Sequence, residues 1–316
     1  MPEGHSVHRL ARQFGDVFTG ERLAVSSPQG RFVQGAALLD GHTLTGADAH
    51  GKHLFLAFEH GLLLHVHLGL YGAWDFGGDA TFRGASSIGA PRKVGERELF
   101  DDDGGAAGQV RYEGPPAPVG AVRVRLASAH GWADLRGATT CQTVTAAEAE
   151  AVLARLGPDP LRNDPGDRGS FVAAIRASRT PLAALLMDQK IIAGVGNVYR
   201  AELLFRQGLD PWLPGKGLTG DDAGRLWDDT VAVMSDGVRD GRIITTPPRY
   251  WDGTAGGAGG PAGENAGGSS RTLPAAGVSH FVYRRQGLDC RDCGTPVALT
   301  ELGARKLYWC PACQAP

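Results

Sequence analysis

Four of the five cysteines stand in a pattern that could bind a metal ion. Cys290 and Cys293 form one C-x-x-C pair, and Cys310 and Cys313 form a second pair sixteen residues further on. This spacing is typical of a tetrahedral zinc site with four thiolate ligands. Two disulfide bonds are the alternative, but disulfides are rare in proteins that are not exported. The sequence therefore predicts one structural Zn²⁺ ion, and Cys141 is expected to be a small buried apolar residue.

The first residues could supply a nucleophile and a proton donor. Methionine aminopeptidase prefers a small second residue, so Met1 is expected to be removed before Pro2. Pro2 would then be a secondary amine with a pKa of about 8, substantially deprotonated near neutral pH. Such an amine attacks a carbon at the aldehyde level to give an iminium ion, and Glu3 could shuttle protons at the same carbon. An ordinary N-terminus with proline at a helix start is the alternative.

A turn between two helical runs offers a site for an anion. Gly194 and Gly196 are free to adopt positive φ, and Asn197 tolerates it. A turn of small residues that opens a helix leaves backbone N–H groups beside the positive end of the helix dipole. Phosphate is the expected anion. A plain αα-hairpin with glycines in its turn is the alternative.

Leu70 and Tyr71 could insert between the stacked bases of a nucleic acid. They lie in Leu68-Gly69-Leu70-Tyr71-Gly72, which is expected to form a turn at the end of a strand. An exposed apolar pair can enter a base stack and fill the gap that a flipped base leaves. Just upstream, His65 and His67 alternate and so share one face of the strand. We interpret them as hydrogen-bonded core or DNA-facing residues and not as metal ligands, because no third ligand lies near in sequence.

Together these motifs resemble those of the formamidopyrimidine-DNA glycosylase and endonuclease VIII family. The matches run in the family's order from Met1-Pro2-Glu3-Gly4 through the helix–two-turn–helix at Met187–Phe205 to the four-cysteine ribbon. The resemblance implies a bifunctional DNA glycosylase and AP lyase of base excision repair. Such an enzyme excises an oxidised base through a Schiff base on Pro2 and cuts the strand by β,δ-elimination. Its partner is double-stranded DNA with a damaged base or an abasic site.

The resemblance also assigns roles to individual residues. Pro2 matches the nucleophile, Glu3 the proton donor, and Lys52 an active-site lysine that contacts phosphates and is associated with elimination. Arg305 matches an arginine that grips phosphates around the lesion and assists the second elimination. The DNA-binding residues that it implies are Leu70, Tyr71, Arg155 and Asn197. Without the resemblance, Lys52 and Arg155 would be interpreted as surface charges.

Two motifs look more like the endonuclease VIII branch, particularly its actinobacterial forms, which points to oxidised pyrimidines. These are the opening M-P-E-G and the Leu70-Tyr71 pair. In that branch the turn reads Gln-Leu-Tyr, so Gly69 puts in doubt any polar contact to the orphaned base. An 8-oxoguanine- or formamidopyrimidine-directed glycosylase on the same fold is one alternative. A non-catalytic damaged-DNA-binding protein is another, although the intact Pro2, Glu3, Lys52 and Arg305 argue against it.

The composition is that of an ordinary globular protein with room for two domains. The 316 residues are 42% apolar and 21% charged, with no apolar run long enough for a membrane span and no signal peptide. We therefore expect a cytoplasmic bacterial protein, a monomer that joins the nucleoid when bound to DNA. The net charge of −2 is low for a nucleic-acid binder. However, residues 171–220 and 271–316 each carry six Lys or Arg against three Asp or Glu, and these two stretches could share one face.

The elements that must position these residues indicate an α+β multidomain protein. Short alternating runs such as His53–Phe58 and Leu62–His67 predict an antiparallel β-sandwich with flanking helices. Apolar spacing predicts later helices over 170–178, 181–190, 198–207 and 221–238, and the ribbon should carry a hairpin over 299–309. The predicted domains are 1–140 (catalytic sandwich), 141–250 (helix–two-turn–helix), 251–276 (disordered Gly-rich loop) and 277–316 (zinc-finger hairpin), with 77–120 as a surface insertion.

Overall fold

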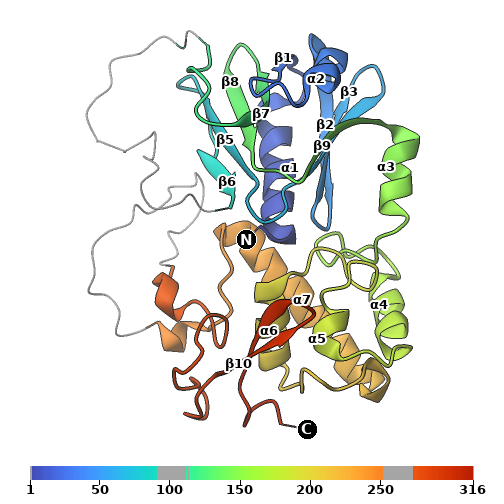
Figure 1. Cartoon of the computed structure of the whole chain (residues 1–316), viewed down its shortest axis with the longest axis vertical. Coiled ribbons are helices and arrows are strands. Elements are labelled where there is room, and N and C mark those ends of the chain that lie inside the picture. Colours follow the sequence, from blue (N-terminus) through green and yellow to red (C-terminus); the bar gives the residue numbers. More distant parts are fainter. Residues whose placement is uncertain (1, 91–111, 113, 252–272, 316) are drawn as a thin grey trace. The chain divides into compact units, whose positions relative to one another are not determined.

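The computed structural model describes residues 2–90, 112, 114–251 and 273–315 (Figure 1). It divides the chain into two compact units, Met1–Leu156 and Gly157–Pro316. Of the predicted segments, most of the Gly-rich loop 251–276 and residues 91–111 and 113 of the insertion lie outside the described residues, as does Met1. The division into four domains stays a prediction.

The first unit is built on antiparallel strands in the continuous order β6-β5-β8-β7-β1-β2-β3-β4-β9. The sheet folds into two layers at β1, because Arg22 and Leu23 pair with β2 whereas Ala24–Ser26 pair with β7. The predicted sandwich with flanking helices is thereby confirmed. The strands are β1 (Arg22–Ser26), β2 (His42–His50), β3 (His53–Phe58), β4 (Leu62–His67), β5 (Ala73–Gly78), β6 (Ser87–Gly89), β7 (Val122–Ala127), β8 (Gly131–Arg136) and β9 (Thr140–Thr145), and the helices are α1 (Gly4–Phe18), α2 (Val33–Leu39) and α3 (Ala146–Leu153).

Helix α1 lies between the two layers (Figure 1) and buries one apolar stripe in the core that they share. Leu10, Phe14 and Phe18 fall on this stripe and are fully buried. The ring of Phe14 meets Trp74 edge-on at 4.8 Å between centroids. Burying side chains of this size stabilises the fold by roughly 1.5–3 kcal/mol each. This packing fixes the start of α1, and with it Pro2 and Glu3, relative to the sheet.

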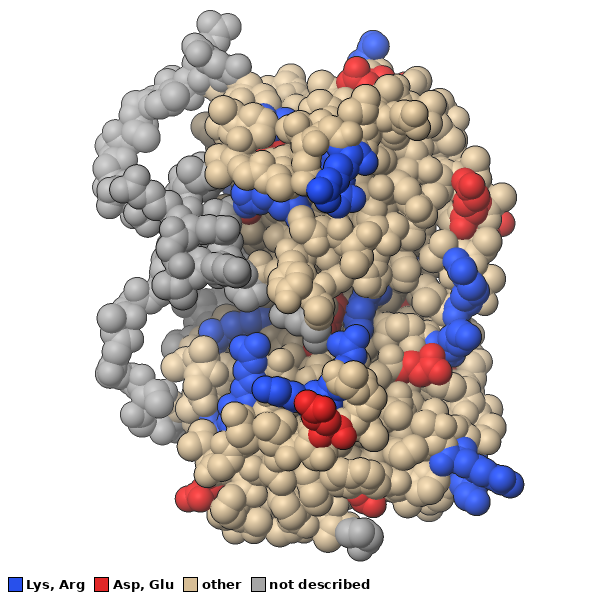
Figure 2. Space-filling view, in the orientation of Figure 1, with Lys and Arg blue, Asp and Glu red and all other residues tan. Residues whose placement is uncertain are grey.

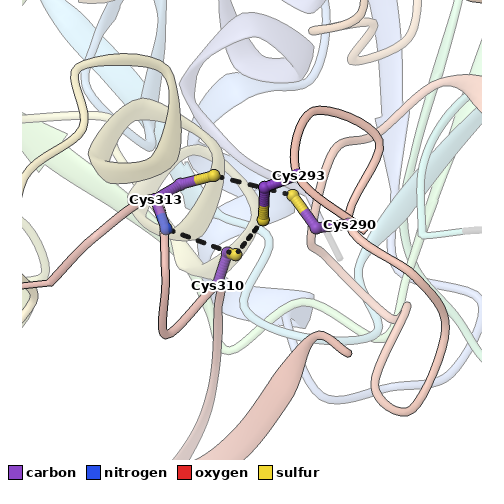
Figure 3. A group of neighbouring side chains, drawn as sticks. All are labelled: Cys290, Cys293, Cys310 and Cys313. Carbon is purple, nitrogen blue, oxygen red and sulfur yellow. Dashed lines mark hydrogen bonds between the residues drawn. The ribbon is translucent and has the colours of Figure 1, made fainter. Parts of the chain in front are cut away.

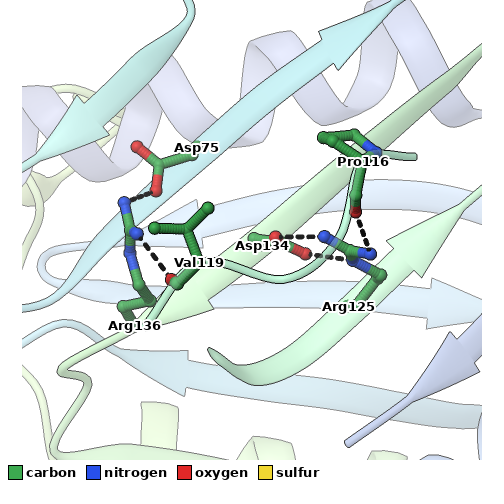
Figure 4. Close-up of polar contacts among 6 residues, drawn as sticks. All are labelled: Asp75, Pro116, Val119, Arg125, Asp134 and Arg136. Carbon is green, nitrogen blue, oxygen red and sulfur yellow. Dashed lines mark hydrogen bonds and ion pairs between the residues drawn. The ribbon is translucent and has the colours of Figure 1, made fainter. Parts of the chain in front are cut away.

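Two ion pairs tie β5, β7 and β8 together (Figure 4). Arg125 of β7 pairs with Asp134 of β8 at 2.7 Å, and Arg136 of β8 pairs with Asp75 of β5. Each arginine also donates to a backbone carbonyl just before β7, Arg125 to that of Pro116 and Arg136 to that of Val119. The end of the predicted insertion 77–120 is therefore held on the sheet, and β6 lies within that insertion.

The second unit combines helices with a zinc-ribbon-like hairpin. Its core joins α4, α5, α6 and α7 to Leu307 of the hairpin, so the hairpin is anchored in the helical part. The helices are α4 (Asp167–Arg176), α5 (Leu182–Leu185), α6 (Asn197–Arg206) and α7 (Gly220–Asp240), with short 3₁₀ turns at Gly215–Gly217, Pro248–Tyr250 and Ala276–Val278; the hairpin is β10 (Ala298–Leu302) and β11 (Arg305–Trp309). None of the described helices combines the length and apolarity that a membrane span requires.

The helix predicted over 181–190 is wrong, because α5 ends at Leu185. The chain then runs through turns that the side chain of Gln189 holds. Its Oε1 accepts from the backbone N–H of Gly194 at 3.0 Å, and its Nε2 donates to the carbonyl of Val195 at 3.0 Å. A side-chain amide that satisfies backbone groups in this way competes with continuation of the helix.

Candidate functional site

The candidate residues divide between the two units. Pro2, Glu3, Lys52 and the Leu70-Tyr71 pair belong to the first. Arg155 follows α3 at the end of that unit, where it is exposed and its Nε donates to the carbonyl of Ala151 at 3.1 Å. Asn197, Arg305 and the four paired cysteines belong to the second unit.

Pro2 and Glu3 are buried at the start of α1. Glu3 occupies the N-cap position, with extended backbone, and its carbonyl accepts the N–H of Ser6 at 3.0 Å. An acidic group is favoured there because the helix dipole places partial positive charge at the first turn. The two candidate residues are therefore adjacent in the chain and both shielded from water.

Lys52 lies beside a cluster of three histidines. It sits with Gly51 in the two-residue turn that joins β2 to β3, where His50 pairs with His53. Nδ1 of His53 lies 2.9 Å from Nε2 of His65, so these rings form a hydrogen bond. Burial and then the positive charge of Lys52 lower the pKa of His67.

Burial is also the main reason that the other two rings resist protonation. It lowers the pKa of His53 to about 3, with a further contribution from neighbouring charges that include Arg155. It lowers the pKa of His65 to about 4, with His67 contributing. The three rings are therefore neutral at neutral pH, and the hydrogen bonds of His65 and His67 agree with the prediction made for these two residues.

Leu70 and Tyr71 point outward from the turn between β4 and β5. Their exposed fractions are 49% and 77%, which places them among the most exposed large apolar side chains. The turn is closed by the N–H of Gly72, which donates to the carbonyl of Leu68 at 3.0 Å. The exposure that a base-stack wedge requires is present.

The two-turn segment leads into α6 with fewer positive φ angles than predicted. Gly194 has φ +89°, whereas Gly196 is the N-cap with φ −126° and Asn197 begins the helix. Asn197 is only 8% exposed. Its Nδ2 donates to the carbonyl oxygen of Lys306 in β11 at 3.0 Å.

Arg200 reinforces this joint between α6 and β11, and it was not predicted from the sequence. Its Nη2 donates to the same Lys306 carbonyl at 2.9 Å and to Oδ1 of Asn197, and the residue is 1% exposed. A charged residue three positions after Asn197, in a helix otherwise dominated by apolar residues, was the available signal. The start of α6 and the hairpin tip are thus bonded to each other.

The hairpin tip presents cations. Gly303 and Ala304 have φ +58° and +57°, which makes a two-residue turn of type I′ between the paired Leu302 and Arg305. Arg305 and Lys306 are exposed directly after this turn. On the face that Figure 2 shows, Lys and Arg side chains gather over the part of the second unit where Figure 1 draws the hairpin. This is a suitable surface for phosphate groups.

A buried carboxylate binds the backbone of the segment that leads into the ribbon. Glu202 of α6 is fully buried and accepts from the backbone N–H groups of Phe281, Val282 and Tyr283 at 2.8, 2.9 and 2.7 Å. The hydroxyl of Thr245 donates to the same carboxylate. Glu202 therefore fixes α6 to two other segments of the second unit.

The four cysteines of the ribbon form a cluster that can bind a metal ion (Figure 3). Their sulfur atoms all lie within 4.8 Å of one another, with Cys290 and Cys313 3.8 Å apart and Cys293 and Cys310 3.4 Å apart. Four sulfurs bound at about 2.3 Å to a tetrahedral zinc ion would lie about 3.8 Å apart. The geometry and the soft thiolate ligands therefore fit zinc.

The comparisons with known proteins point to one family, and together they cover almost the whole chain. The model of the formamidopyrimidine-DNA glycosylase N-terminal domain matches residues 1–141, and that of its H2TH domain matches residues 156–248. The chain is 40% identical over 314 residues to endonuclease 8 1 of Mycobacterium tuberculosis, covering 99% of this chain and 100% of that protein.

Solved structures share the fold. The MutM (Fpg) protein of Thermus thermophilus has a TM-score of 0.68 at 26% identity, covering 99% of this chain and 98% of that one. The formamidopyrimidine-DNA glycosylase of Lactococcus lactis, bound to DNA containing an AP site, has a TM-score of 0.69 at 18% identity, covering 99% and 100% of the two chains.

Proposed function

The chain belongs to the formamidopyrimidine-DNA glycosylase and endonuclease VIII family of base excision repair, and on that premise we propose that it is a bifunctional DNA glycosylase and AP lyase acting on oxidised pyrimidines. The exposed Leu70-Tyr71 pair carries the proposal, because base flipping requires an apolar group that can replace the flipped base. Full-length identity of 40% to a protein named endonuclease 8 supports the pyrimidine preference. The proposed partner is damaged double-stranded DNA, bound by a monomer.

In the proposed mechanism Pro2 displaces the damaged base. Its nitrogen forms a bond to C1′ of the sugar while the bond from C1′ to the base breaks and the base leaves with that electron pair. The Pro2 nitrogen then loses its proton, and its lone pair expels O4′, so that the sugar ring opens to give an iminium ion between Pro2 and C1′ while O4′ takes up a proton. Glu3, buried beside Pro2, is the proposed carrier of these protons.

The iminium ion then makes strand cleavage possible. It is an electron sink, so it acidifies the C2′ proton, and two successive eliminations release the 3′ and 5′ phosphates to leave a one-nucleotide gap. We assign Lys52 and Arg305 to the phosphates around the lesion, and Arg155 to the DNA backbone. Asn197 gives one amide hydrogen to Lys306, which leaves its second for the proposed phosphate contact.

The ribbon has a structural role in this proposal and takes part in no chemical step. Cys290, Cys293, Cys310 and Cys313 would hold one Zn²⁺ ion, which would fix the fold of a segment too small to have a core of its own. The joint from Asn197 and Arg200 to Lys306 would then keep Arg305 in place.

A panel of duplexes tests the proposal. Each duplex carries one oxidised pyrimidine, one 8-oxoguanine, one abasic site or no lesion, and base release and strand cleavage are measured separately. We expect release and cleavage with oxidised pyrimidines and cleavage at the abasic site. Preference for 8-oxoguanine would favour the other substrate class. Tight binding with neither base release nor cleavage would favour the non-catalytic alternative.

A further inference from the structure

The turn that presents Leu70 and Tyr71 packs against a second turn, the connection between β8 and β9. Thr139 of this connection bonds twice to the carbonyl oxygen of His67, the last residue of β4. Its backbone N–H donates at 3.0 Å and its hydroxyl donates at 3.1 Å. The start of the wedge turn, residues 68–72, is therefore attached to a residue about seventy positions later in the chain.

The His67 ring extends this attachment into the turn. Its Nδ1 accepts the backbone N–H of Gly69 at 3.2 Å and lies 3.1 Å from the Thr139 hydroxyl oxygen. Because burial and Lys52 lower the pKa of His67, the ring is neutral at neutral pH and Nδ1 can accept a hydrogen bond. Thr139, His67 and Gly69 thus form one hydrogen-bonded group at the base of the turn.

The packing also explains why glycine stands at position 69. Gly69 has φ +66°, and a Cβ atom added to it would lie 2.4 Å from Oγ1 of Thr139. On the other side, Gly137 has φ +65°, and a Cβ added there would lie 2.5 Å from the carbonyl oxygen of Tyr71. The Thr139 side chain therefore occupies the space in which a side chain at position 69 would begin.

We propose that Thr139 is a positioning residue for the Leu70-Tyr71 wedge. It takes the space beside Gly69 that a longer residue would fill, and through His67 it holds the turn in shape before DNA binds. A turn that is already ordered loses less conformational entropy when it enters the base stack. This inference rests on the proposed glycosylase function, because only base excision uses the wedge.

Thr139→Val tests the proposal because it keeps the shape of the side chain and removes the hydroxyl. We expect the single-turnover rate of base excision to fall about fivefold, the effect of one lost hydrogen bond, while the dissociation constant for undamaged duplex stays within about twofold. Thr139→Ser should restore the rate. Thr45→Val is the matched control, since the Thr45 hydroxyl also donates to a backbone carbonyl of the same sheet, that of Ala57, at 3.1 Å.

A double-mutant cycle separates positioning from general stability. In the Leu70→Ala/Tyr71→Ala background, Thr139→Val should cause no further loss of excision rate, because the group that it positions is gone. An unchanged excision rate in Thr139→Val, a fully additive loss in the cycle, or an equal loss in Thr45→Val would overturn the inference. Failure of the wild-type protein to release any damaged base would instead overturn the proposed function.

Discussion

Nδ2 of Asn197 donates to the carbonyl oxygen of Lys306 at 3.0 Å, joining the first residue of α6 to the cationic tip of the β10–β11 hairpin. The family resemblance implies a phosphate contact for Asn197, whereas this bond gives it a second task within the protein. It holds the backbone that carries Arg305. Two phosphate-binding candidates from residues more than one hundred positions apart are thereby placed in one rigid arrangement.

Asn197→Ala should therefore weaken DNA binding by more than the loss of its own phosphate contact would, because the bond to Lys306 is lost as well. We expect the dissociation constant for an abasic-site duplex to rise about five- to tenfold and the free energy of unfolding to fall by about 1 kcal/mol. Binding titrations and thermal unfolding check this. Gln207→Ala is the control, since its amide bonds Asp229 at 3.1 Å near the other end of α6. Equal weakening in both variants would contradict a special role for Asn197.

Cys290→Ser should release the metal ion and abolish DNA binding while the first unit stays folded. Structural zinc contributes roughly 10 kcal/mol or more to the folding of such small units. Metal analysis should find one zinc ion per chain in the wild type and in Cys141→Ser, because burial raises the pKa of Cys141 to about 12 and it lies outside the cluster. Absence of zinc from the wild-type protein would remove the assignment.

The neutral histidines predict a loss of stability in acid. The pKa of His53 in the folded protein is about 3, below its ordinary value of 6.5, so the unfolded chain binds the proton more readily. The stabilisation is complete above pH 6.5 and is lost as the pH falls toward 3. His53→Gln should therefore lower the melting temperature less at pH 5 than at pH 7.5, because the glutamine cannot be protonated. Equal changes at both pH values in His53→Gln would refute this.

Replacing both Leu70 and Tyr71 by Ala should slow base excision more than it weakens DNA binding. Unstacking costs a few kcal/mol that only lesion recognition must meet, while phosphate contacts dominate affinity. Single-turnover excision rates compared with dissociation constants for undamaged duplex measure the difference. Equal excision rates for this variant and the wild type would rule out a wedge.

Pro2, and not a lysine, should carry the covalent intermediate. A lysine amine starts at a pKa of about 10.4, whereas an N-terminal amine starts about two units lower and is more often neutral at pH 7. Borohydride should trap the protein on lesion-bearing DNA, and peptide mapping should place the link on Pro2. A link on Lys52 or Lys190, or undiminished trapping when an extra residue precedes Pro2, would show the mechanism to be wrong.

Local patterns predicted the elements that have a clear period. Strands β3 and β4 occupy the predicted residues His53–Phe58 and Leu62–His67, and α6 differs from its prediction by one residue at each end. Strand β8 was not predicted, because Gly131–Leu135 are all buried and show no alternation between core and solvent. The candidate functional residues were identified either from short motifs, whose residues lie close together in the sequence, or from the family resemblance.

The contacts that position the site could not be predicted in the same way. Arg200 meets Lys306 across 106 residues, and Thr139 meets His67 across 72. Such pairs leave no local period in the sequence, since each residue belongs to an element whose own pattern is satisfied without the other. The shortness of α5 likewise depends on the bonds of Gln189 and not on helix propensity.

The contacts of the Glu202 carboxylate also have a consequence for which parts of the chain unfold together. It binds the backbone of residues 281–283, and Phe205 of the same helix stacks on Phe281 with 4.9 Å between ring centroids. Fraying of this segment would leave the buried carboxylate group without its hydrogen-bond donors, so we expect the segment and α6 to unfold together. The match to the H2TH domain model ends at residue 248, but the part of the chain expected to unfold with α6 includes residues 281–283, which lead into the ribbon.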